Sequence, residues 1–273
     1  MKRRSFITLV GGAAAWPLAA RAQPPSGRPL VALLSPLSAA TATRNIAGFR
    51  NVHGELKALP DSIRGLSAAG GTGPAQVGFG ADGDVLVVTE KATNRLTSYR
   101  VRRDGTPGQA VVTASSGLTP FGFAFDRRDH LIVSEAFGGA ANASAASSYR
   151  FDERSASPLL VSGSVPTNQT AACWVAVTPN GKFAFTGNAG SSSVSSYRIA
   201  RSGKLELASA AAGSTGANAG VTDLAVSTSG RHLFALAPRS LQIVSFKLAY
   251  DGSLTAVGAG TGLPAGSAGL AAN

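Results

Sequence analysis

Two glutamates, Glu90 and Glu135, occupy equivalent places in the sequence, because each ends a short apolar run, residues 85–88 in one case and 131–133 in the other. A carboxylate can activate a water molecule as a general base, and a guanidinium such as that of Arg95 can stabilise the resulting oxyanion. Two carboxylates at one opening would also raise the pKa of one of them. Glu90, Glu135 and Arg95 are therefore the candidate catalytic residues. The alternative is that each glutamate simply ends a strand in solvent.

Aligned with the two glutamates, other side chains are expected around the same opening of the fold, at what we call its rim, and could contact a substrate. The candidate binding residues are Gln76, Asn94, Trp174, Asn188 and Asp223, with Lys91 and Arg239 beside them. Trp174 can either stack on a substrate ring or plug the opening. Glu90, Glu135, Asn188 and Asp223 could also offer oxygens to a divalent cation, although calcium takes about six to eight such ligands. The metal site is therefore left open, and no cofactor is required.

The histidines and the single cysteine are weaker candidates for catalysis. His130 and His232 open second strands, and His53 lies in a turn, so all three are expected at the surface of the opposite rim. Cys173 is the only cysteine, so no intrachain disulfide can form. Its neighbours Ala172 and Trp174 favour a buried thiol, and no histidine aligns with it as a partner.

A repeat with a period near 50 residues positions all of these side chains. The triplet Ser98-Tyr99-Arg100 returns at residues 148–150, at 196–198 and, as Ser-Phe-Lys, at 245–247, in steps of 50, 48 and 49 residues. Each copy contains four short apolar runs rich in β-branched and aromatic residues, which indicates strands. Asp-Gly, Asn-Gly and Ser-Gly pairs separate the runs and favour tight hairpins. Four antiparallel strands in a unit of this length are typical of a β-propeller blade.

Four complete blades are predicted at about residues 73–118, 119–168, 169–218 and 219–262. The rest predicts one split blade, made from residues 29–68 and 263–273. Residues 268–272 would form its first strand, and 30–34, 45–50 and 56–59 the other three. The prediction is an all-β propeller of five four-stranded blades, closed by pairing the C-terminal strand with the N-terminal blade, because an open ring would expose strand edges. The alternative is an incomplete piece of a larger ring.

Residues 1–22 have the pattern of an export signal peptide, and residues 23–273 form the single propeller domain. Lys2-Arg3-Arg4 precedes an apolar stretch that is too short to span a bilayer, and Ala20-Arg21-Ala22 is a cleavage site. The arginine pair fits twin-arginine export, with an ordinary secretory signal as the alternative. We expect a bacterial periplasmic or secreted monomer with no membrane span in the mature chain. Removing the four basic residues of the signal lowers the net charge from +11 to +7, that is 21 basic minus 14 acidic residues. The charges are mixed in sign, so no nucleic-acid partner is expected.

From about Asn45 to the C-terminus the sequence resembles the lactonase-family β-propellers, which are related to 6-phosphogluconolactonase and the carboxymuconate cyclases. The resemblance is carried by residues 73–79, by Asp82-Gly83 with 87–91, by 94–100, and by 178–182. It implies a seven-bladed ring that opens a lactone. The chain departs from the family in having too few blades, and in having Gln76 where the family's inner strand often carries histidine.

Residues 1–49 are instead similar to the start of twin-arginine-exported substrate-binding proteins of transport systems. Three functions follow from these resemblances. The first is an exported hydrolase of a sugar or muconate-type lactone that uses a carboxylate base at the channel mouth. The others are a non-catalytic propeller that binds a ligand or a protein, and an inactive remnant of a seven-bladed lactonase.

Overall fold

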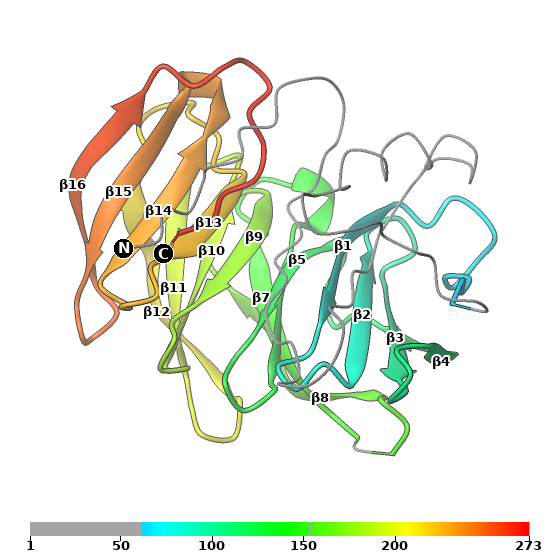
Figure 1. Cartoon of the computed structure of the whole chain (residues 1–273). Helices are drawn as coiled ribbons and strands as arrows, with labels where there is room; N and C mark the ends of the chain where they lie inside the picture. The colour runs from blue at the N-terminus through cyan, green and yellow to red at the C-terminus, as the bar shows by residue number, and fades with distance from the viewer. Residues whose placement is uncertain (1–61, 153, 273) are drawn as a thin grey trace, which may run out of the picture.

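The computed structural model describes residues 62–152 and 154–272, and these residues form four separate sheets (Figure 1). Each sheet contains four antiparallel strands that are consecutive in the sequence. The prediction of an all-β protein built from four-stranded propeller blades is therefore confirmed.

The first blade contains β1 (Pro74–Phe79), β2 (Val85–Glu90), β3 (Arg95–Val101) and β4 (Pro107–Ala114), and the second contains β5 (Pro120–Phe125), β6 (Leu131–Glu135), β7 (Ala145–Phe151) and β8 (Pro158–Pro166). The third contains β9 (Ala172–Val177), β10 (Phe183–Asn188), β11 (Ser193–Ile199) and β12 (Leu205–Ser214), and the fourth contains β13 (Asp223–Val226), β14 (His232–Ala237), β15 (Gln242–Leu248) and β16 (Leu254–Thr261). Two short 3₁₀ helices, η1 (Phe137–Gly139) and η2 (Pro238–Ser240), follow β6 and β14.

Glycines in the hairpin turns allow the strands to reverse direction. Gly83, between β1 and β2, has a φ of +74°, and Gly105, between β3 and β4, has a φ of +85°. These values lie in the left-handed region, which glycine adopts without the steric cost that a Cβ atom brings. The Asp-Gly pairs recognised in the sequence therefore mark the turns that they predicted.

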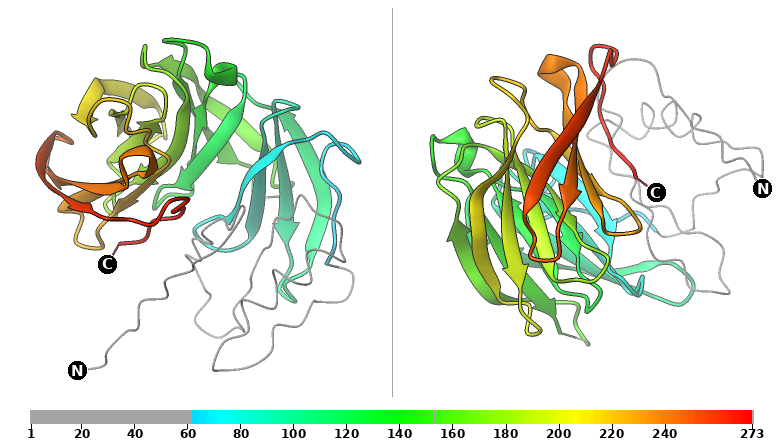
Figure 2. Two further views of the ribbon diagram at one scale, coloured as in Figure 1. Left: turned by 90° about the horizontal axis from the view of Figure 1, so that it is seen from above. Right: turned by 90° about the vertical axis from the view of Figure 1, so that its left-hand side faces the viewer.

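The blades are arranged in an arc around a common axis, as Figure 2 shows from above. The first strands of successive blades lie innermost, with β1 against β5, β5 against β9, and β9 against β13. The apolar core consists of three clusters, each shared by two neighbouring blades rather than enclosed within one. Burial between blades therefore drives their association, because a single sheet cannot cover its own apolar faces.

The tyrosine of the repeated triplet bonds each blade to the chain that precedes it. The Tyr149 hydroxyl accepts a hydrogen bond of 2.8 Å from the backbone N–H of Ser116, in the linker between the first and second blades. The Tyr197 hydroxyl donates to the carbonyl of Val165, at the end of β8, over 3.3 Å. The Tyr99 hydroxyl donates to the carbonyl of Gly65 over 2.7 Å. In the fourth blade Phe246 takes this place and has no hydroxyl.

In the first two blades, the serine of the triplet bonds its blade to the one that follows. Ser98 in the first blade donates to the carbonyl of Ala156, in the last hairpin of the second blade, over 2.7 Å. Ser148 in the second blade donates over the same distance to the carbonyl of Gly203, in the last hairpin of the third. The triplet therefore recurs because it contacts the blades on both sides.

The predicted fifth blade is only partly covered by the described residues. Its expected strands at 30–34, 45–50 and 56–59 lie outside them, as do the export signal of residues 1–22 and His53. Residues 268–272 are described but form no strand, contrary to expectation. They run beside β13 in the fourth blade, where the N–H of Leu270 donates to Asp223 Oδ2 over 2.6 Å. In the part of the chain that is described, no helix is long and apolar enough to span a membrane.

Replacing Tyr149 with phenylalanine should destabilise the protein by about 1 kcal/mol, because it removes the hydrogen bond that the tyrosine hydroxyl accepts from the N–H of Ser116. Urea unfolding measures this loss. Tyr250→Phe is the matched control, because Tyr250 is 101% exposed and its change should have almost no effect. Equal midpoints for the two variants would show that the tyrosine hydroxyl does not stabilise the contact between blades.

Candidate functional site

Glu90 and Glu135 do occupy equivalent positions, as the last residues of β2 and β6. Glu90 pairs with Pro74 at the start of β1, and Glu135 pairs with Pro120 at the start of β5. Both side chains are 0% exposed. The alternative of a glutamate that ends its strand in solvent is therefore wrong for both residues.

The carboxylate of Glu90 accepts several hydrogen bonds. The backbone N–H of Ser67 donates over 3.0 Å, Thr93 donates over 2.8 Å, and the hydroxyls of Ser67 and Thr97 also donate. Burial acts to raise the pKa of Glu90, but these hydrogen bonds together outweigh it and hold the pKa below its usual value. Glu90 is therefore ionised at neutral pH and fixes the segment that leads into the first blade.

Glu135 makes the corresponding contact in the second blade. Its Oε1 accepts a hydrogen bond of 2.8 Å from the backbone N–H of Gly117, in the linker from the first blade. The fit is close, because a Cβ atom on Gly117 would come within 2.2 Å of Oε2. Burial raises the pKa of Glu135, and the hydrogen bonds from Ser147, Ser164 and Gly117 only partly oppose that rise.

Three of the other predicted site residues also contact neighbouring parts of the backbone or sheet. The Gln76 side chain bonds both backbone groups of Phe123, donating to the carbonyl over 2.9 Å and accepting from the N–H over 2.8 Å. Asn94 Oδ1 accepts from the N–H of Thr119 over 2.7 Å. Asn188 is buried and donates to two serines of β11. Arg95 begins β3 opposite Glu90 and is exposed. Roles for these residues in catalysis or binding stay predictions.

Asp223 is the carboxylate nearest the axis, because it begins the inner strand β13. It is 4% exposed, and its two oxygens accept from the backbone N–H groups of Leu224 and Leu270, over 2.8 and 2.6 Å. Burial raises the pKa of Asp223 to about 7, against the lowering effect of these two hydrogen bonds. The group therefore changes its charge near neutral pH.

Two aromatic rings and one cation meet at the rim where the inner strands begin. The rings of Phe121 and Trp174, from β5 and β9, lie with centroids 5.2 Å apart at an angle of 51°. Lys91 Nζ lies 5.2 Å from the centroid of Phe121, within the range of a cation–π contact. These residues and Arg239, which lies in η2, form what we call the rim cluster.

The positive charges of Lys91 and Arg239 both act on the thiol of Cys173, in the third blade. Burial raises the pKa of the Cys173 thiol to about 11, while an amide hydrogen bond at Ala189 and the positive charges of Lys91 and Arg239 oppose the rise. Lys91 belongs to the first blade and Arg239 to the fourth. The rim cluster therefore joins residues from all four described blades. Sequence reasoning placed Lys91, Trp174 and Arg239 at this rim but missed Phe121, which its position one residue after Pro120 could have indicated.

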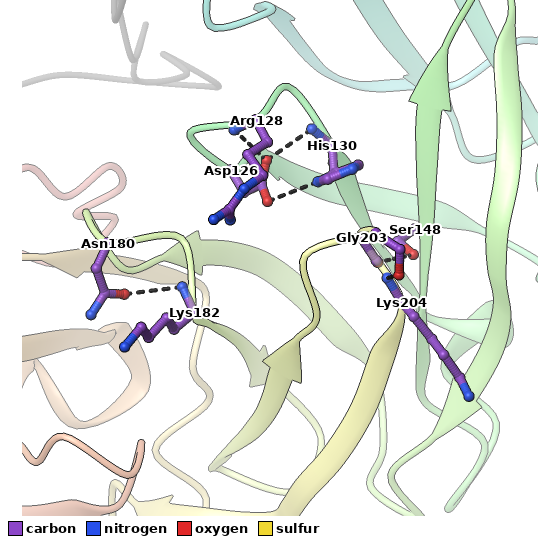
Figure 3. A network of polar contacts seen from close by, with 9 residues as sticks. Asp126, Arg128, His130, Ser148, Asn180, Lys182, Gly203 and Lys204 are labelled. Carbon is purple, nitrogen blue, oxygen red and sulfur yellow. Dashed lines mark hydrogen bonds and ion pairs between the residues drawn. The ribbon is translucent and has the colours of Figure 1, made fainter.

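The opposite rim contains hairpin turns, which Figure 3 shows from close by. His130 Nδ1 lies 2.9 Å from Asp126 Oδ2, and Asp126 Oδ1 accepts from the N–H groups of Arg128 and His130. His130 was expected at the surface, but it is buried, because its ring packs where Gly203 of the next blade leaves room. His232 is exposed, as expected.

Asp126 and His130 order a turn, where Asp126 accepts hydrogen bonds from two backbone N–H groups and contacts the ring of His130. No set of three or more histidine, cysteine, aspartate or glutamate side chains in the described ranges is placed to hold a metal ion. The four residues considered for a cation, Glu90, Glu135, Asn188 and Asp223, are each buried within a different blade. The prediction of a divalent cation therefore receives no support from the arrangement of these side chains.

Comparison with known proteins agrees with the fold and with the motifs. The sequence profile described as lactonase, 7-bladed beta-propeller, matches residues 136–252. A search of curated proteins found no match. A candidate 6-phosphogluconolactonase from Bacteroides uniformis has a similar crystal structure, with a TM-score of 0.58 and 20% identity over 69% of this chain and 57% of its own. The structure of the periplasmic gluconolactonase PpgL of Pseudomonas aeruginosa is also similar, with a TM-score of 0.57 and 21% identity over 71% of this chain and 59% of its own. The resemblance to the lactonase-family propellers is thus confirmed.

The chain spans less than two thirds of the length of these structures. Four blades out of the seven in the family description amount to about 57%, which equals the share of the Bacteroides protein that is covered.

The two glutamates should have opposite effects on stability as the pH changes. The pKa of Glu90 is depressed in the folded protein, so its stabilisation is present above about pH 4.3 and is lost as the pH falls. The pKa of Glu135 is raised, so its contribution is present below about pH 4.3 and is lost as the pH rises. Relative to the parent, Glu90→Gln should become less stable with rising pH and Glu135→Gln more stable. Urea unfolding from pH 2 to pH 8 tests both, because the change for Glu90 falls below about pH 4.3 and that for Glu135 above it, and parallel profiles would contradict the contacts described.

The pH dependence of stability that Asp223 contributes should have the same sign as that of Glu135, because burial raises the pKa of both carboxyl groups. Its stabilisation is full below about pH 3.9, the usual pKa of aspartate, and is lost as the pH rises to about 7. The stability of the parent relative to Asp223→Asn should therefore fall across this interval, by on the order of 3–4 kcal/mol. The unfolding free energies of both proteins at several pH values provide the measurement. A constant difference would mean that the carboxyl group is not buried as described.

Proposed function

We propose that the protein is an exported lactone hydrolase that receives its substrate at the rim cluster. The observation that carries the proposal is the contact of Phe121 with Trp174 and with Lys91 where the inner strands begin, and Arg239 adds a second positive charge that acts on Cys173 together with that of Lys91. Aromatic faces bind the apolar side of a sugar or muconate ring, and cations stabilise the oxyanion that forms when water attacks a lactone carbonyl. The confirmed lactonase-type fold makes this reaction class the natural one to test.

A carboxylate base would activate the water, and the pKa directions favour Glu135 and Asp223 over Glu90. A general base acts best when its pKa is near the working pH. Burial raises the pKa of Glu135 and of Asp223, whereas that of Glu90 is lowered. We therefore assign Glu90 to holding the linker and keep Glu135 and Asp223 as the candidate bases. No cofactor is required by this chemistry.

A second function, a propeller that binds a lactone or sugar acid without turnover, is favoured by one observation. Both glutamates are fully buried and hydrogen-bonded to linker segments, so neither carboxylate is free in this arrangement to contact a water at the rim. In that case the rim cluster would bind ligand and the protein would have no hydrolytic activity. The leader-like residues 1–22 would place either activity outside the cytoplasm.

Hydrolysis of aldonolactones and muconolactones by the mature protein tests the first function. Lys91→Met and Arg239→Met should each lower kcat/KM by about 10-fold or more, because each removes a charge near the oxyanion. The matched controls are Lys204→Met and Arg231→Met, exposed residues near the opposite rim, which should retain full activity. Glu135→Gln and Asp223→Asn then identify the base.

Calorimetric titration with the same lactones separates the two functions. Binding that is weakened by the rim variants, without turnover in any protein, would favour the binding propeller. Turnover that is unaffected by all of the rim and carboxylate variants would reject the proposed site.

A further inference from the structure

The turn between β15 and β16 carries a fully exposed tyrosine. Tyr250 is 101% exposed, more than any other large hydrophobic residue of the described chain. The turn itself is anchored, because the N–H of Gly252 donates to the carbonyl of Ala249 over 3.1 Å, and a Cβ atom on Gly252 would come within 2.4 Å of the Phe183 ring in the third blade. A fixed turn therefore holds the Tyr250 ring in solvent, at the rim of the hairpin turns.

Basic residues from three blades lie around this turn. Arg198 Cζ is 5.3 Å from the centroid of the same Phe183 ring. A Cβ atom on Gly230 would lie 3.5 Å from Pro179, so the β13–β14 turn touches the β9–β10 turn. A Cβ atom on Gly181 would lie 2.8 Å from the side chain of Arg127, so the β9–β10 turn in turn touches the β5–β6 turn. We call the residues that these contacts bring together the basic patch: Arg127, Lys182, Arg198, Arg231 and Tyr250.

The positive charges of the basic patch are not neutralised by neighbouring carboxylates. All four cations are exposed. In the ranges that the structure describes, none of them lies within ion-pair distance of a carboxylate, whereas Arg100 of the first blade pairs with Asp84 at 3.2 Å. The carboxylate of Asp251, next to Tyr250, accepts from the N–H and the hydroxyl of Ser253 over 3.0 and 2.7 Å. The patch therefore presents positive charge around an exposed aromatic ring.

We infer that the basic patch docks the protein on the surface of a bilayer that contains anionic lipids, with the Tyr250 ring among the headgroups. Lysine and arginine side chains close to such a surface are each attracted to it. Tyrosine is enriched at the boundary of a membrane, because its ring is apolar and its hydroxyl is polar. The hairpin turns and the starts of the inner strands lie at opposite ends of each sheet. A docked protein would therefore keep the rim cluster open to solution.

The composition of the patch favours a lipid surface over a protein or a nucleic acid. A stable protein interface has an apolar core, but of the large hydrophobic residues that are exposed in the described chain, Tyr250 alone lies in a hairpin turn at this rim. A single-stranded nucleic acid stacks successive bases on several aromatic rings along a basic groove, and the patch offers one ring on projecting turns. A layer of anionic headgroups requires only the charge and an interfacial ring.

Sedimentation of the mature protein with vesicles tests this inference. The protein should bind vesicles of phosphatidylglycerol and phosphatidylcholine but not vesicles of phosphatidylcholine alone, and high salt should release it, because salt screens exposed charges. The triple variant Arg127→Gln, Lys182→Gln, Arg231→Gln should lower the partition coefficient by about 10-fold or more, since each basic residue near the surface contributes roughly fivefold. Arg198 is left in place because it packs on Phe183.

The matched control removes the same number of charges from turns outside the patch. Arg102, Arg103 and Arg154 are exposed residues in the second hairpins of the first and second blades. Changing all three to glutamine should leave most of the vesicle binding in place. An equal loss in the two triple variants would show that net charge alone attracts the protein to the vesicles, and would overturn the inference.

Tyr250→Ser tests the role of the ring separately from that of the charges. It should weaken vesicle binding without moving the urea midpoint, because the side chain is fully exposed. Unchanged binding would overturn the placement of the ring among the headgroups. A protein that binds labelled single-stranded DNA but no vesicles would overturn the choice of a lipid surface. None of these measurements uses lactone turnover, so their outcome is independent of the proposed function.

Discussion

Contact between neighbouring blades is the interaction on which the rest of the structure depends. A four-stranded sheet of this size has two apolar faces and no core of its own, so its stability comes from the sheets beside it. The clusters that bury Phe185, Tyr197 and Leu131 each span two blades. Because apolar burial has no direction, it does not by itself fix how one sheet is placed on the next.

Hydrogen bonds supply that direction. The hydroxyl of Thr89 accepts from the N–H of Gln76 in its own blade and donates to the carbonyl of Phe121 in the next, over 3.1 and 2.6 Å. Ser134 repeats the arrangement one blade later, between Gly122 and the carbonyl of Cys173. Together with the serine and tyrosine of the triplet, these groups join the blades at the inner strand, the third strand and the linker. The positions of Phe121 and Trp174 at the rim follow from this alignment, because each inner strand is held by the blade before it.

The sequence predicted the blades well because blade formation is local. Strand alternation, Asp-Gly turns and the recurring triplet all act within about 50 residues. The directions of the side chains at the rim were not predictable in the same way. The pairing of first and second strands is interrupted between Pro74 and Gln76, between Pro120 and Phe123, and between Thr186 and Asn188. A bulge of this kind changes which face a side chain occupies. Glu90 and Glu135 pair with Pro74 and Pro120, where these interruptions begin, and their carboxylates contact the segments that lead into their blades.

The polar residues at the rim consequently form two groups, those that contact the backbone of a neighbouring segment and those that contact an aromatic ring. Side chains that reach a backbone group of a neighbouring segment, such as Gln76 and Asn94, are engaged in assembling the ring. Lys91 instead contacts an aromatic ring from the next blade. The positive charge of Lys91, in the first blade, and that of Arg239, in the fourth, both oppose the rise in the pKa of Cys173. A cation held on an aromatic face keeps its hydrogen-bond donors, whereas both oxygens of Glu90 already accept hydrogen bonds from its own blade and from the segment before it. Glu90 therefore belongs to the framework that positions the rim, and the donors that remain on Lys91 are the reason for assigning ligand binding to the rim cluster in the proposed function.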